Sequence, residues 1–157
     1  MATPDEAVTA LRAFQKALPS AIIRGLRRGL RVAERLAKTK YMERKDNRHP
    51  IVFDPPNPPP GPLGIRSARL VRTVKVGPMR FTGTKVIGGL IAGNSQVKYA
   101  RIHEKGGRAG RGGRSRIRPR PYLRPALDDA RKAIEAEVVK EMRVAARATL
   151  QTIARGL

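Results

Sequence analysis

The sequence contains no cysteine, no tryptophan and only two histidines among its 157 residues. Without cysteine there are no disulfides, thiolate metal sites or cysteine nucleophiles, which fits assembly in a reducing cytoplasm. Neither His49 nor His103 has a cluster of carboxylates beside it, so we expect no metal site. The stretch GGRAGRGG lacks the Gly-Lys-Ser/Thr ending of a phosphate loop, and no G-x-S-x-G motif is present. We therefore expect neither an enzyme nor a bound cofactor.

Long apolar runs and acidic residues are also scarce. No run approaches the roughly 18 residues of a membrane span, and the polar start MATPDEAV is unlike a signal peptide. The sequence has 12 acidic residues and 34 Lys and Arg, which gives a formal net charge of +22. A chain this basic binds polyanions at low salt, which predicts nucleic acid or an acidic protein as partner. Only three Tyr and three Phe are present, which disfavours a stacking platform for single-stranded nucleic acid.

The excess positive charge is concentrated in two segments. Residues 20–45 hold nine basic and two acidic residues, and residues 101–124 hold nine basic and one acidic. Simple solvation of the helix arginines is the plainer interpretation, but five arginines with one glutamate nearby form a lopsided face, which keeps contact with a partner open. We expect the contacts to a protein partner or to DNA to come from their arginines, namely Arg24, Arg27, Arg28, Arg31, Arg35, Arg108, Arg111, Arg114, Arg116, Arg118 and Arg120.

Apolar spacing predicts a helix at each end of the chain. Residues 1–45 are expected to form an N-terminal helix with a kink at Pro19, because proline lacks the N–H that a helix interior needs. Residues 121–157 keep helical spacing and are expected to form a long C-terminal helix. The apolar positions of the first helix are Val8, Leu11, Phe14 and Leu18 before Pro19, and Ile22, Leu26, Leu30, Ala33 and Leu36 after it. Those of the second are Leu127, Ala130, Ile134, Val138, Met142, Ala145, Leu150 and Ile153.

The middle of the chain is expected to be irregular and then extended. Residues 46–64 are a proline-rich connector, residues 65–104 alternate as strands do, and residues 105–120 are an Arg/Gly loop. The expected fold is a single α+β domain of residues 1–157. In it, a small antiparallel sheet carries the kinked N-terminal helix and the long C-terminal helix on one face, with the basic loop extending from it.

Three motifs occur in order along the chain. The first is Gly61-Pro62-Leu63-Gly64-Ile65-Arg66-Ser67, the second is Tyr99-Ala100-Arg101-Ile102-His103-Glu104-Lys105-Gly106-Gly107, and the third is Pro119-Arg120-Pro121-Tyr122-Leu123-Arg124-Pro125-Ala126-Leu127. With these motifs the chain resembles a family of tailed-bacteriophage proteins, the tail-completion, neck or head–tail joining proteins of siphophages and Mu-like phages. It departs from the family pattern at Lys105, where an aromatic residue is usual, and in its arginine-rich insert.

The second and third motifs make physical sense as determinants of the fold. One face of a short helical turn would carry Tyr99, Ile102 and His103, and the glycines after it would end the turn by allowing positive φ. Tyr122 and Leu123, held between prolines, would seat the last helix. The expected fold-anchoring residues are Tyr99, Ile102, His103, Glu104, Gly106, Pro121, Tyr122, Leu123 and Pro125.

The resemblance implies a structural virion protein of the head–tail junction, assembled in the host cytoplasm, that joins the tail to the DNA-filled capsid. It implies a homo-oligomeric ring, sixfold by the symmetry of the tail, whose partners are its own copies and neighbouring neck and tail proteins, with no membrane and no small-molecule substrate. DNA in the lumen stays open as a further contact. For loop 105–120 we favour docking on an acidic protein, because aromatic and base-reading residues are missing.

A basic nucleic-acid-binding protein is the alternative that the composition supports. In that case the charge of +22 and the Arg/Gly run would be the main functional features. A steep loss of affinity with salt and co-purification with nucleic acid would distinguish it from a ring protein.

Overall fold

The computed structural model describes residues 4–44, 63–65, 68–109 and 111–155. The predicted connector lies outside these residues except for its last two, which belong to a short strand. In chain order the elements are α1 (Pro4–Thr39), β1 (Met42–Arg44), β2 (Leu63–Ile65), α2 (Ala68–Thr73), β3 (Lys75–Val76), β4 (Arg80–Phe81), β5 (Val86–Ile87), β6 (Leu90–Ile91), α3 (Ala100–Lys105), β7 (Gly107–Ala109), a 3-10 turn (Arg111–Gly113), β8 (Ser115–Ile117) and α4 (Leu123–Arg155).

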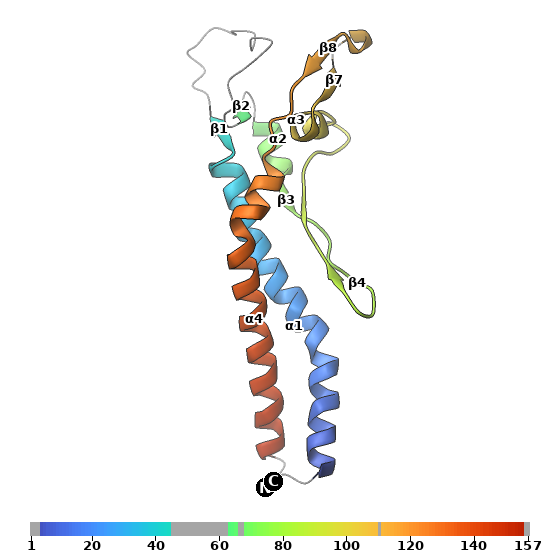
Figure 1. Cartoon of the computed structure of the whole chain (residues 1–157), viewed down its shortest axis with the longest axis vertical. Coiled ribbons are helices and arrows are strands. Elements are labelled where there is room, and N and C mark those ends of the chain that lie inside the picture. The colour runs from blue at the N-terminus through green and yellow to red at the C-terminus, as the bar shows by residue number, and fades with distance from the viewer. Residues whose placement is uncertain (1–3, 45–62, 66–67, 110, 156–157) are drawn as a thin grey trace.

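Two long antiparallel helices form the body of the protein. Figure 1 shows α1 and α4 side by side over most of their length, with the start of α1 and the end of α4 at the same end. With 36 residues, α1 spans about 54 Å. The chain is therefore mostly helical and carries the long C-terminal helix that the apolar spacing predicts.

The two helices approach closely because small residues recur at every fourth position of α1. A Cβ atom on Gly25 would lie 2.5 Å from Val138 Cα, and one on Gly29 would lie 2.4 Å from Ile134 Cα. Neither position can hold a side chain at this helix separation. The buried small residues of this stripe are Ala21, Gly25, Gly29, Ala33 and Ala37.

The apolar face predicted for the first helix is only partly the buried one. Leu30 and Ala33 are buried, whereas Ile22, Leu26 and Leu36 are half-buried. Pro19 lies inside α1, and the helix continues through it to Thr39. The kink at Pro19 stays a prediction.

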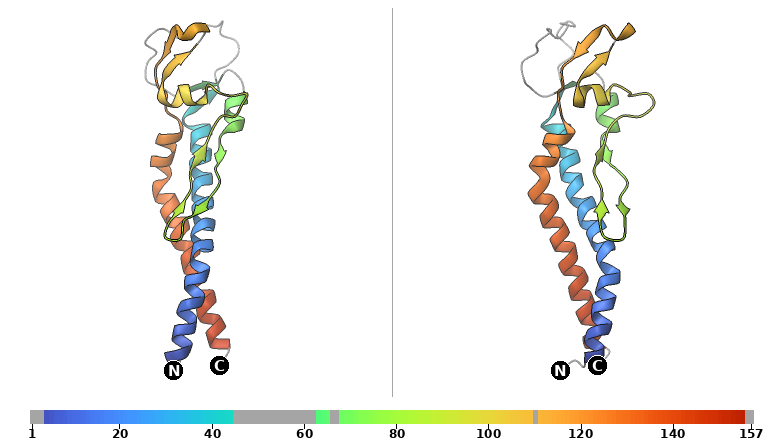
Figure 2. Two further views of the ribbon diagram at one scale, coloured as in Figure 1. Left: turned by 90° about the vertical axis from the view of Figure 1, so that its right-hand side faces the viewer. Right: turned by 45° about the vertical axis from the view of Figure 1, so that its right-hand side comes forward.

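The prediction of one antiparallel sheet over 65–104 is wrong in its details. Within the described residues the strands form four separate two-stranded ladders, and α1 packs against α4 instead of both covering one sheet. Three ladders are antiparallel, and β1 pairs with β2 in parallel. The β3–β6 and β4–β5 ladders follow one another in a narrow ribbon that lies along α1 (Figure 2).

Two segments expected as strands are short helices, α2 and α3. Leu70 and Val74, both buried, are four residues apart. A spacing of four keeps two residues on one face of a strand and also on one face of a helix, so the pattern alone could not separate the two. For α3, the interpretation of Tyr99–Gly106 as a helical turn matches the structure, although the assignment of 65–104 to strands does not.

Residues expected as the Arg/Gly loop contain a β-hairpin. Strand β7 pairs with β8, and Gly112 and Gly113 turn the chain with φ of +71° and +67°. Figure 2 shows this hairpin at the end of the molecule opposite the start of α1 and the end of α4. Because this stretch is rich in glycine, the two short strands that pair, β7 and β8, could not be recognised from the sequence.

A compact core lies beneath this hairpin, where α1 ends and α4 begins. Its largest fully buried side chains include Tyr122 and Val74. It draws on α1, β1, α2, the loop before α3, α3 itself and α4, through Ala37, Met42, Leu70, Val74, Val97, Ala100, Tyr122 and Ala126. Among the described helices, none has the length and apolar character needed to cross a bilayer.

Candidate functional site

Glu104 joins the second and third motifs. Its carboxylate accepts the backbone N–H of Tyr122 at 2.8 Å and of Leu123 at 3.0 Å on Oε2, and that of Arg124 at 3.0 Å on Oε1. The first N–H groups of a helix have no partner within the helix. A negative charge at this end also interacts favourably with the positive end of the helix dipole. Pro125 has no N–H to satisfy. Glu104 therefore caps α4 from outside the helix.

Tyr122 fixes the same junction from the inside. Its side chain is fully buried, and its hydroxyl donates to the Ala100 carbonyl at 3.4 Å. Burial, with a smaller effect of the nearby Glu104 charge, raises the pKa of Tyr122 to about 12. The phenol is thus neutral at physiological pH, and it ties the start of α4 to α3.

The end of α3 requires a glycine. Gly106 has φ of +73°, donates its N–H to the Ile102 carbonyl at 2.8 Å, and would place a Cβ 2.9 Å from Pro119 Cδ. The Arg120 N–H donates to the His103 carbonyl at 2.7 Å. Residues before and after the hairpin are thereby held together at its base.

The remaining fold-anchoring residues lie around this junction with different exposures. Tyr99 and His103 meet edge to face with ring centroids 5.7 Å apart, although Tyr99 is exposed. Ile102 and Leu123 are half-buried, and Pro121 is exposed.

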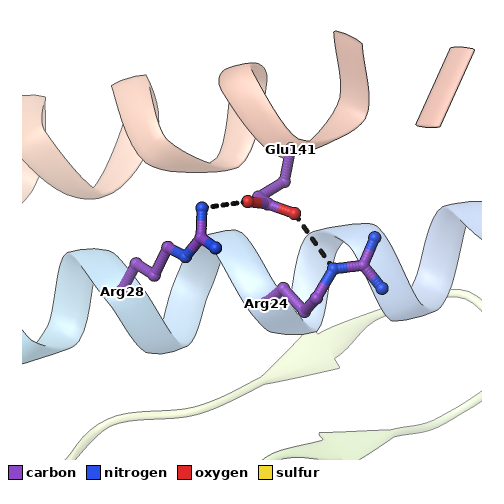
Figure 3. Close-up of polar contacts among 3 residues, drawn as sticks. All are labelled: Arg24, Arg28 and Glu141. Carbon is purple, nitrogen blue, oxygen red and sulfur yellow. Dashed lines mark hydrogen bonds and ion pairs between the residues drawn. The ribbon is translucent and has the colours of Figure 1, made fainter. Parts of the chain in front are cut away.

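The arginines of α1 do not behave as one group. Arg24 Nε lies 2.9 Å from Glu141 Oε2, and Arg28 pairs with Glu141 Oε1 (Figure 3). Glu141 is only 5% exposed, and its pKa is lowered, chiefly by the hydrogen bond from Arg24. These two arginines stabilise the helix pair, while about half of each side chain remains exposed.

Arg27 and Arg31 line a shallow cavity of about 510 Å³ between α1 and the ribbon. Lys75 and Glu34 also line it. Arg31 also lines a second cavity of about 390 Å³, together with Arg35 and Lys38. Glu34 is bound to Lys38 on its own helix, so the first cavity has three cations and one carboxylate that is already paired.

The hairpin carries the second group of predicted contact residues. Arg108 and Arg116 stand directly opposite each other in the β7–β8 ladder. Both are exposed, as are Arg114 and Arg118 on either side of Arg116. Arg111 begins the turn, and Arg120 is half-buried at the base.

Three features of the structure were not predicted from the sequence. Small residues at four-residue intervals in α1, with Gly25 and Gly29 at the centre, were a readable sign of close helix packing. Glu141 interrupts the apolar spacing of α4, which is a weak sign of a buried ion pair. The capping role of Glu104 had no local sign, because its partners are 18 to 20 residues away.

Within the described part of the chain, no three His, Asp or Glu side chains gather as metal ligands would. Comparison with protein-family models, with curated proteins and with solved structures gave no match.

Proposed function

We propose that the protein is a structural component of a bacteriophage virion at the head–tail junction, in a tail-completion, terminator or neck position. The proposal comes from the resemblance of the motifs. One structural observation supports it: Glu104 of the second motif caps the helix that begins within the third. Motifs that bind each other form one structural unit, as a family signature would, and are less readily explained as separate chance matches.

In this proposal the protein acts as a homo-oligomeric ring, most simply with the sixfold symmetry of the tail. Repeating a subunit of charge +22 around a closed ring concentrates like charge, so the ring needs acidic neighbours or DNA to assemble. We expect a monomer in isolation at moderate salt. The cavity beside Arg27, Arg31 and Lys75 is a suitable place for carboxylates of a neighbouring protein.

Two finer features belong to the same proposal. The ring of Pro19 lacks a hydrogen-bonding N–H and crowds the Gln15 carbonyl, so α1 should bend there and direct its first turns away from α4. The basic segment 105–120, built around the β7–β8 hairpin, should extend to a neighbouring molecule in the assembled ring.

Disruption of the gene in the phage that encodes this chain tests the proposal. Electron microscopy of the lysates should show DNA-filled heads and separate tails, and a plasmid copy of the gene should restore joined particles. Joined, infectious particles at normal yield without the gene would contradict it.

A basic nucleic-acid-binding protein remains the second candidate, favoured by the exposed arginines of the hairpin. It predicts no defect in joining heads to tails when the gene is disrupted, so the same experiment separates the two functions.

A further inference from the structure

We propose that the β7–β8 hairpin binds the phosphate backbone of duplex DNA through one face made of arginines. We call this set, Arg108, Arg114, Arg116 and Arg118, the arginine face. The inference rests on the proposed function only for which DNA is bound, namely the genome where it crosses the ring.

Strand geometry places these side chains together. Arg108 and Arg116 are register partners, so their side chains leave the same face of the ladder. Arg114 and Arg118 are two residues before and after Arg116, and side chains two residues apart share a face in extended chain. All four residues are exposed. Only Arg116 belongs to β8 itself, and Arg114 and Arg118 flank the strand directly on either side.

No acidic group of the described chain neutralises the arginine face. Glu104 is the one acidic residue within 101–124, and both of its oxygens are engaged by the N–H groups of α4. None of the ion pairs in the described residues includes a member of the face. Like charges directly opposite each other in a ladder are destabilising. An external anion would relieve that repulsion.

The other face of the hairpin is turned to the protein. Gly107 pairs with Ile117, and a Cβ on Gly107 would lie 3.9 Å from Ile102 Cγ1 of α3. Ala109 and Ile117 are half-buried. The hairpin is therefore supported on α3 by its small and apolar residues, while its arginines are exposed. It lies at the end of the molecule opposite the start of α1 and the end of α4 (Figure 2).

The chemistry of the arginine face suits DNA better than an acidic protein. Protein interfaces normally have an apolar or aromatic centre, and no such side chain belongs to this face. Interfaces with DNA are more polar and much more positive. A two-stranded ribbon also fits the major groove, which is about 12 Å wide. The lack of aromatic and base-reading residues excludes base readout but leaves phosphate contact intact, which revises our preference for protein docking.

The first test measures binding of the full-length protein to a 30-base-pair duplex of mixed sequence over a range of salt concentrations. Each phosphate contact contributes about 0.9 to the slope of log affinity against log salt. The double variant R108Q/R116Q should therefore reduce the slope by about 1.8. The matched control R27Q/R31Q removes the same charge from exposed positions on α1 and should reduce the slope by less than about half as much. Equal reductions in the two variants would overturn the proposal, because binding would then reflect total charge alone.

The second test uses R108E, which replaces the like-charged cross-strand pair with an opposite-charged one. Amide hydrogen exchange of residues 107–117 should slow in the free protein, while DNA affinity falls and the salt slope drops by at least about 0.9. Unchanged DNA affinity would overturn the proposal. So would binding of polyglutamate, in place of DNA, through the arginine face. Both tests use purified protein, so their failure would leave the head–tail function standing, and failure of the gene disruption would leave the DNA contact standing.

Discussion

At the scale of single residues, Glu104 has the most consequential set of contacts. Glu104 lies on α3, which ends before the hairpin begins. Its carboxylate accepts hydrogen bonds from three backbone N–H groups at the start of α4. The prolines on either side of Tyr122 restrict the backbone to a few conformations. The cap and the restricted backbone together set where α4 starts relative to α3.

Replacing Glu104 with alanine should destabilise the protein by about 2 kcal/mol. The loss combines a helix cap, worth about 0.5–2 kcal/mol, with the cost of leaving N–H groups at a partly buried site without a partner. For a chain of this size the melting temperature should fall by about 4–8 °C. Thermal unfolding followed by circular dichroism would measure it.

Glu135→Ala is the matched control, because Glu135 is an exposed residue of α4. It removes the same charge and should change stability by less than about 0.5 kcal/mol. Equal losses from Glu104→Ala and Glu135→Ala would show that the capping contacts do not set the stability of α4.

The importance of the second and third motifs could be predicted from residue type, but their mechanism could not. Gly-Gly after an amphipathic turn and a tyrosine between prolines both indicate a defined local conformation. The bond between Glu104 and α4 crosses the whole hairpin, whereas a local capping box has its partners three residues apart. Only the folded chain brings these groups together.

At the scale of elements, the close contact of α1 and α4 depends on glycines. Side chains at Gly25 and Gly29 would meet backbone atoms of α4, which cannot rotate away as the end of a side chain can. The ion pairs of Glu141 with Arg24 and Arg28 lie beside this contact and link the same two helices.

Gly25→Ala and Gly29→Ala should each lower stability by about 1 kcal/mol. Overpacking costs about 1–3 kcal/mol, and the better helix propensity of alanine returns at most about 1 kcal/mol. Urea unfolding would give the difference. Gly89→Ala is the control, since a Cβ there has no atom within 4 Å and should change stability by less than about 1 kcal/mol.

Stabilisation by Gly25→Ala or Gly29→Ala would contradict this account. Alanine is the better helix former, so a gain in stability would mean that the helices are far enough apart to accept a methyl group at these positions.

The two long helices were predictable because apolar spacing over 30 residues has few other interpretations. The strands and short helices between them were not, because segments such as ARLVRT satisfy both periods at once. Tertiary packing of Leu70 and Val74 in the common core decides that segment. The hairpin was missed because its strands are three residues long, shorter than a pattern of alternation needs.

At the scale of the whole molecule, the separation of charge from core is the main feature. A helix pair carries small hairpins along one side and at one end, and the core lies where they join (Figure 1). Arginines outside the core lie in two places. One group lies on α1 beside a cavity, and the other lies on the β7–β8 hairpin. In the proposed ring, the surface on α1 would contact a neighbouring protein and the hairpin would contact DNA.

Cryo-electron microscopy of intact phage particles tests the central claim most directly. We expect the chain in a closed ring between capsid and tail, with the β7–β8 hairpin toward the DNA in the lumen and Arg27 and Arg31 at contacts with a neighbouring protein. The account would be contradicted if the chain were missing from the particle, or if the hairpin and the α1 arginines all faced bulk solvent.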